Sequence, residues 1–284
     1  MGANGTRLDA TVRIPVLDAF RTVNEALLEL LADFSAEEWH RTTVHKDRSV
    51  KDLTAHLLHG SLRRLTGMRD QYRPPAGKKF STTAELTQFI QDDNRAFMLG
   101  MARVSPQILV EMIARYDPEV LRLFESLDPV APGLGVVWAG EWISQNWFDV
   151  AREYTEKWHH QQQLRDATGR PALYDPTLLT PALETFARGL PFAYRSLEAG
   201  DGTSISILVK DVAGVAWTLR WERDTWSLWT AAVADSVTSI SASADTLWRV
   251  WTKGISPCQA LDALEINGDR SYAGPLTRFV AIMA

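Results

Sequence analysis

Residues 152–166 read REYTEKWHHQQQLRD, and this stretch constrains the fold most because it places Glu156 and His160 four positions apart on a predicted helix. Residues four apart on an α-helix differ by only about 40° in direction, so their side chains can converge on one point. A carboxylate oxygen and an imidazole nitrogen held in this way suit a divalent metal ion. The pair alone is weak support, because Glu and His at this spacing also form ordinary surface contacts.

A third ligand has to come from another helix, and His56 is the best candidate. It lies in the stretch SVKDLTAHLL at residues 49–58, where Ser49 is a predicted N-cap with Asp52 three positions later. Three protein ligands leave coordination positions free for water or substrate, as in catalytic sites. We expect zinc first, and nickel, iron or manganese fit nearly as well. Spacing alone does not establish that the two helices touch.

The remaining histidines compete with these three. His159 points about 100° away from His160 on the same helix, so we predict a neighbour of the site and not a ligand. His59 follows His56 by three positions and could join the site, but we favour a solvated or packing residue. His40 and His45 fit no regular pattern.

The chain as a whole predicts an α+β protein of two domains. Apolar spacing predicts helices over residues 15–34, 49–68, 83–99, 105–127, 138–168 and 180–198. After a Gly-containing break at residues 199–202, β-branched and aromatic residues predict four strands, at residues 204–209, 214–221, 227–232 and 236–241. Helical patterns return over residues 244–252, 256–264 and 274–283. We therefore expect a helical bundle in residues 1–199 and a small α+β domain in residues 200–284.

Composition limits the classes of function. Hydrophobic residues make up 45% and charged residues 23% of the 284, the balance of a soluble globular protein. No apolar run approaches the roughly 18 to 20 residues of a membrane helix, and the N-terminus has no basic segment followed by an apolar one, so we expect a cytoplasmic protein without a membrane partner. The net charge of −5 argues against nucleic acid as a partner. The single cysteine, Cys258, suits a reducing compartment, and we expect its small side chain to be buried and to serve only in packing.

The two quoted stretches resemble signatures of the mycothiol-dependent maleylpyruvate isomerases, a family with a DinB-like up-down helical bundle and a sterol-carrier-like C-terminal domain. Trp39 with residues 49–58 resembles the first signature, and residues 152–166 resemble the second. The resemblance implies His56, Glu156 and His160 as the metal ligands. Three further stretches, residues 244–249, 266–269 and 280–283, resemble the sterol-carrier-like part. One departure is Arg48, which stands where the family usually has an aromatic residue.

This resemblance implies a metalloenzyme that acts on a small electrophile with mycothiol as a low-molecular-weight thiol cosubstrate. A bound metal would lower the pKa of the thiol, and the thiolate would add to an activated double bond. Bond rotation and elimination would then isomerise a maleylpyruvate-like substrate, whereas other electrophiles would undergo thiol transfer. Arg152 and Arg220 are candidate anchors for an acidic substrate, with salt bridges as their alternative role.

Two other classes of function remain open at this point. The 11 Trp residues could line a cavity for an apolar ligand, which would make the chain a metal-containing carrier. A metal-bound water in place of a thiol would make it a hydrolase. The natural substrate, the identity of the metal and the oligomeric state lie beyond the sequence.

Overall fold

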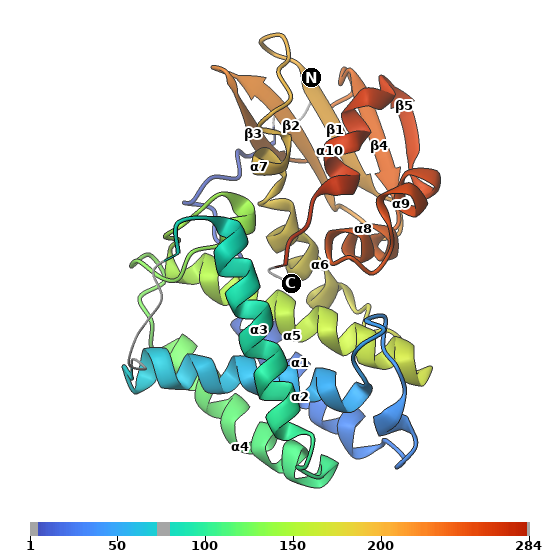
Figure 1. Cartoon of the computed structure of the whole chain (residues 1–284). Helices are drawn as coiled ribbons and strands as arrows, with labels where there is room; N and C mark the ends of the chain where they lie inside the picture. Colours follow the sequence, from blue (N-terminus) through green and yellow to red (C-terminus); the bar gives the residue numbers. More distant parts are fainter. Residues whose placement is uncertain (1–4, 73–79, 283–284) are drawn as a thin grey trace. The chain divides into compact units, whose positions relative to one another are not determined.

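The computed structural model describes residues 5–72 and 80–282 (Figure 1). The chain groups into two compact units, each made of segments that are separate in sequence. The described residues of the first, the sheet unit, are 5–15, 132–155 and 175–282. Those of the second, the bundle unit, are 16–72, 80–131 and 156–174. Because these groupings are not continuous segments, the domain boundary at residue 199 stays a prediction.

The bundle unit is helical, as the apolar spacing predicts. Its helices are α1 (Leu17–Ala32), α2 (Val50–Arg64), α3 (Thr83–Met101), α4 (Pro106–Glu125) and the second half of α5 (Asn146–Thr168). A short 3₁₀ turn, η1 (Glu38–His40), precedes α2, and a π-helical turn, η2 (Leu65–Arg69), follows it. No helix in the described parts of the chain has the length and apolarity to cross a membrane.

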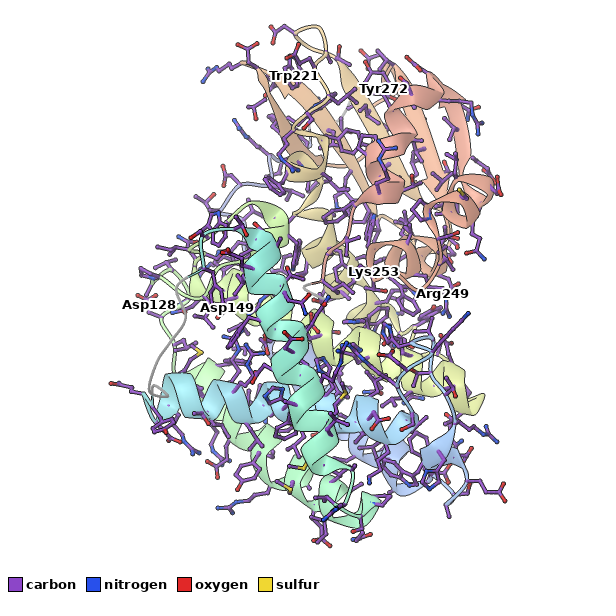
Figure 2. All side chains as sticks on the ribbon, in the orientation of Figure 1. Asp128, Asp149, Trp221, Arg249, Lys253 and Tyr272 are labelled. Atoms are coloured by element: carbon purple, nitrogen blue, oxygen red, sulfur yellow. The ribbon has the colours of Figure 1, made fainter. Side chains whose placement is uncertain are left out.

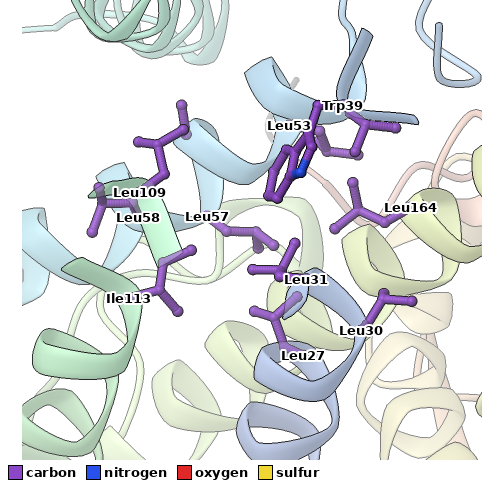
Figure 3. Close-up of a cluster of buried hydrophobic side chains, with 12 residues drawn as sticks. Leu27, Leu30, Leu31, Trp39, Leu53, Leu57, Leu58, Leu109, Ile113 and Leu164 are labelled. Atoms are coloured by element: carbon purple, nitrogen blue, oxygen red, sulfur yellow. The ribbon is translucent and has the colours of Figure 1, made fainter. Parts of the chain in front are cut away.

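A cluster of buried aliphatic side chains holds these helices together (Figure 3). Leu27 of α1, Leu53 of α2, Leu109 of α4 and Leu164 of α5 are completely buried in it, and Trp39 of η1 joins them. Burying one such side chain stabilises the fold by about 1.5–3 kcal/mol. The cluster therefore fixes α2 against α5, the two helices that carry the predicted metal ligands.

The start of α2 is fixed by the predicted capping box. The backbone N–H of Asp52 donates to Ser49 Oγ over 3.2 Å, and Asp52 Oδ2 accepts from the Ser49 backbone N–H over 2.9 Å. These two bonds satisfy donors that a helix N-terminus leaves without a partner. They also set the register of the helix on which His56 lies.

The sheet unit contains a five-stranded sheet in the order β3-β2-β1-β4-β5 (Figure 1). β1 pairs in parallel with β4, and the other neighbours are antiparallel. The strands are β1 (Ser204–Val209), β2 (Ala216–Glu222), β3 (Thr225–Thr230), β4 (Thr238–Ala242) and β5 (Glu265–Gly268). Its helices are α6 (Pro176–Ala187), α7 (Leu190–Tyr194), α8 (Ala244–Trp251), α9 (Pro257–Ala263) and α10 (Ala273–Arg278), with 3₁₀ turns η3 (Val137–Ala139) and η4 (Arg270–Tyr272).

The predicted α+β class is confirmed, with helices in the N-terminal part and a sheet in the C-terminal part. Several local predictions were wrong. A fifth strand, β5, was missed because it has only four residues and is largely exposed. Cys258 is exposed and not buried. Met283, which ends the last family-like stretch, lies outside the described residues, as do the outermost residues of both predicted domains.

Two predicted helices extend across positions where the chain is not α-helical. The helix predicted from residue 138 begins at Asn146, because Trp138 lies in η3 and Gly140 follows with φ +86°. A side chain there would be strained, and a Cβ atom would lie 2.6 Å from the ring of Phe192. The helix predicted over residues 180–198 is two helices, α6 and α7, separated at Gly189, where a Cβ atom would clash with Phe279 at 2.4 Å.

Candidate metal centre

His56 of α2 meets Glu156 and His160 of α5 inside the bundle unit. One donor atom from each of the three side chains lies within 4.8 Å of the other two. Glu156 Oε2 lies 3.3 Å from His160 Nε2, as expected for side chains one helical turn apart. The rings of His56 and His160 have centroids 4.8 Å apart and stand at 82° to each other. The structure therefore brings together the two helices that spacing alone could not connect.

The electrostatic environment keeps His56 neutral and Glu156 ionised, the protonation states that a metal ion requires. Burial lowers the pKa of His56 well below 6.5, and its electrostatic interaction with His160 acts in the same direction. Burial would raise the pKa of Glu156, but the hydrogen bond from His160 and the charges of His159 and His56 hold that pKa below its usual range. A neutral imidazole and an ionised carboxylate are the forms that bind metals.

Gln163 fixes the orientation of the His160 ring. His160 Nδ1 lies 2.8 Å from Gln163 Oε1, and because this oxygen can only accept, the nitrogen carries the proton. In a neutral imidazole the lone pair of His160 would then be on Nε2, the atom that faces Glu156. Metal-binding histidines commonly have their second nitrogen held by such a donor bond.

The three side chains fit a divalent cation. His56 Nδ1 is buried and has no hydrogen-bond partner among the described residues, which is costly for a polar atom. Two imidazole nitrogens and one carboxylate oxygen suit zinc, and also nickel, iron or manganese. Three ligands leave further coordination positions for a substrate or a thiol.

The two neighbouring histidines have different surroundings. His59 Nδ1 donates to Asn94 Oδ1 over 3.0 Å, and its ring stacks on Phe97 at a centroid distance of 4.3 Å. His59 is thus held in packing between α2 and α3. His159 is completely buried, and its ring centroid lies 3.9 Å from that of His160. His159 acts on the site electrostatically, since it lowers the pKa of Glu156.

The two candidate substrate anchors both lie in the sheet unit. Arg152 forms ion pairs with Asp149 at 2.6 Å and with Glu153 at 3.1 Å; Asp149 is labelled in Figure 2. Arg220 lies over the ring of Trp229 at 4.7 Å. A role for either residue in binding substrate stays a prediction.

Two residues beside these candidate ligands, Gln163 and His45, were missed from the sequence. Gln163 was detectable in principle, because it lies three positions after His160 on the same helix. His45 was not, since it belongs to a loop without periodicity. Burial lowers the pKa of His45 from 6.5 to about 4, and the charges of His160 and Arg48 contribute to this shift.

The fold and the cluster together define an α+β protein with a histidine and carboxylate site in a helical bundle. The family model described as "Mycothiol maleylpyruvate isomerase N-terminal domain" matches residues 20–165, just over half of the chain. The chain therefore belongs to this family. The matched residues include all three side chains of the cluster.

Solved structures agree with the fold. A histidine-to-alanine variant of the mycothiol-dependent maleylpyruvate isomerase is 12% identical and has a TM-score of 0.55, over 88% of this chain and 91% of that chain. Another structure of a mycothiol-dependent maleylpyruvate isomerase is 13% identical with a TM-score of 0.53, over 82% of this chain and 86% of that chain. At such identities the likeness concerns the fold alone. No curated protein matches the chain.

A ubiquinone synthesis protein also matches, at 13% identity, over 39% of this chain and 84% of that chain. Its TM-score of 0.24 is too low to bear on the fold of the C-terminal part. The sterol-carrier likeness of that part therefore stays a prediction.

Proposed function

We propose that this chain is a metal-dependent isomerase that uses mycothiol to convert a maleylpyruvate-like cis double bond into the trans form. The observation that supports it is the convergence of His56, Glu156 and His160 within the family-matched residues. Zinc is the ion we propose, since it accepts this donor set with open positions. The cytoplasm, where low-molecular-weight thiols remain reduced, is the compartment we propose.

The residues of the chain have separable tasks in this proposal. His56 and His160 each offer a neutral imidazole nitrogen, and Glu156 offers the negative charge. Gln163 keeps the proton of His160 on Nδ1. When bound, the metal would act as a Lewis acid that favours the thiolate form of a thiol at neutral pH. Burial of the histidines strengthens each of these charge interactions.

The test is turnover of maleylpyruvate by the purified protein with and without mycothiol. Wild type should isomerise the substrate only when the thiol is present, and His160→Ala should lose roughly 100-fold or more. His40→Ala is the matched control, because His40 is exposed in the described structure. Isomerisation by wild type at equal rates without thiol would contradict the proposal. A product that keeps the thiol would instead indicate a thiol transferase.

A further inference from the structure

Arg48 lies directly before the N-cap of α2, in a loop whose backbone is tightly bonded. Its N–H donates to the carbonyl oxygen of His45 over 3.0 Å. Its own carbonyl oxygen accepts from both the backbone N–H and the hydroxyl of Thr43, each over 3.0 Å. Thr42 and Ser49 pair as an antiparallel bridge around this turn. The backbone of Arg48 is therefore fixed relative to the helix that carries His56.

The loop of Arg48 is joined to the site through His45. The side chain of His45 bonds to Gln163, and Gln163 Oε1 lies 2.8 Å from His160 Nδ1. The charge of Arg48 lowers the pKa of His45, after burial and His160. Nε and Nη1 of Arg48 are both buried, and neither donates to any atom of the described chain. A buried donor of a charged group without an acceptor costs several times what a satisfied one contributes.

Neither Glu156 nor Asp47 accepts a hydrogen bond from Nε or Nη1 of Arg48. Glu156 is held in its ionised form by His160, His159 and His56, and Arg48 is not among the groups that lower its pKa. Asp47 is exposed and acts on His45. With no acceptor among the described residues, Nε and Nη1 of Arg48 are placed to donate to a bound molecule.

We propose that Arg48 binds a carboxylate of a small organic acid that enters the site formed by His56, Glu156 and His160. The proposal rests on the proposed function in one respect only, that the cluster is the place where a substrate binds. Charge supports it: a divalent ion with ionised Glu156 and neutral histidines carries one net positive charge, and Arg48 adds a second. Two positive charges in a partly buried site favour a small mono- or dicarboxylate.

The experiment measures binding of maleate, a small dicarboxylate, to the metal-loaded protein by calorimetry at pH 7 in the absence of thiol. Wild type should bind maleate, and Arg48→Met should bind it roughly 10- to 100-fold more weakly. Arg48→Lys keeps the positive charge but lacks the planar guanidinium, so its loss of maleate affinity should be intermediate. Arg41→Met is the control, since Arg41 is half exposed and pairs with Glu38 at 3.7 Å. Dimethyl maleate, which is uncharged, should not distinguish the proteins.

The proposal is overturned if wild type does not bind maleate, or if Arg48→Met and Arg48→Lys both bind it as tightly as Arg41→Met does. Metal content and circular dichroism of each variant are measured on the same samples, so a loss of metal or fold is seen directly. Binding without thiol separates the two proposals. Loss of maleate binding in Arg48→Met, in a protein that never isomerises maleylpyruvate, would support the anchor and contradict the isomerase. If Arg48→Met binds maleate as tightly as wild type, and wild type isomerises maleylpyruvate, the anchor is contradicted and the isomerase is supported.

Discussion

His160 Nδ1 donates to Gln163 Oε1 over 2.8 Å, so one helix supplies both a candidate ligand and the residue that orients it. Replacing Gln163 with Met should lower metal affinity about 10- to 100-fold while leaving all three ligands in place. Competition with a chromophoric chelator measures the change. Gln162→Met is the control, because Gln162 bonds to the backbone of Leu173 and not to the cluster. Equal metal affinity in the two variants would show that Gln163 does not orient His160.

Breaking the buried ion pair between Lys157 of α5 and Asp117 of α4 should destabilise the bundle unit. Lys157 Nζ donates to Asp117 Oδ2 over 2.6 Å, and Ser61 of α2 donates to Asp117 Oδ1 over 2.6 Å. Lys157→Met leaves a buried carboxylate without its counter-charge, so we expect a loss of about 3–5 kcal/mol in unfolding free energy. Urea denaturation measures it.

The double variant Lys157→Met with Asp117→Leu is the matched comparison for this pair. Removing both charges leaves no uncompensated ion, so much of the lost stability should return. If Asp117→Leu lowers the unfolding free energy of the Lys157→Met protein by as much as it lowers that of wild type, the two side chains do not act as a pair.

Stability of the metal-free protein should fall as the pH is lowered from 6.5 towards 4. The pKa of His45 is about 4 in the folded chain, compared with an ordinary value of 6.5. Between these values the unfolded chain binds more protons than the folded one, so acid favours unfolding. His56, whose pKa is also lowered by burial, acts in the same direction.

His45→Asn removes one of these two protonation sites. Urea denaturation of metal-free wild type and His45→Asn at pH 7 and pH 5 measures the effect, and the variant should lose less stability between the two. A variant that loses as much as wild type would mean that His45 titrates normally in the folded chain.

The sequence predicted the candidate site better than the loops around it. The four-residue spacing of Glu156 and His160 is a property of any helix, and Ser49 with Asp52 marks the start of α2 in the sequence itself. The meeting of His56 with that pair is a tertiary contact, produced by the aliphatic cluster of Figure 3, and no local pattern encodes it. Only the family resemblance predicted it.

The residues that escaped prediction owe their places to non-local packing. His45 is held beside the site because Thr43 bonds to the backbone of its loop, and such bonds produce no periodic pattern in the sequence. The late start of α5 depends on Gly140, whose left-handed backbone and contact with Phe192 break a pattern that is otherwise apolar and helical. β5 pairs with β4 through its backbone, so its exposed side chains carry no signal.

The most direct measurement is the metal content, by elemental analysis, of wild type, His56→Ala, Glu156→Gln and His160→Ala, with His59→Ala as control. His59 is on the same helix as His56 but bonds to Asn94. We predict about one divalent ion per chain in wild type and the control, and a near-complete loss in the two His variants. Full metal occupancy in His56→Ala and His160→Ala would contradict the assignment of these three residues as the metal centre.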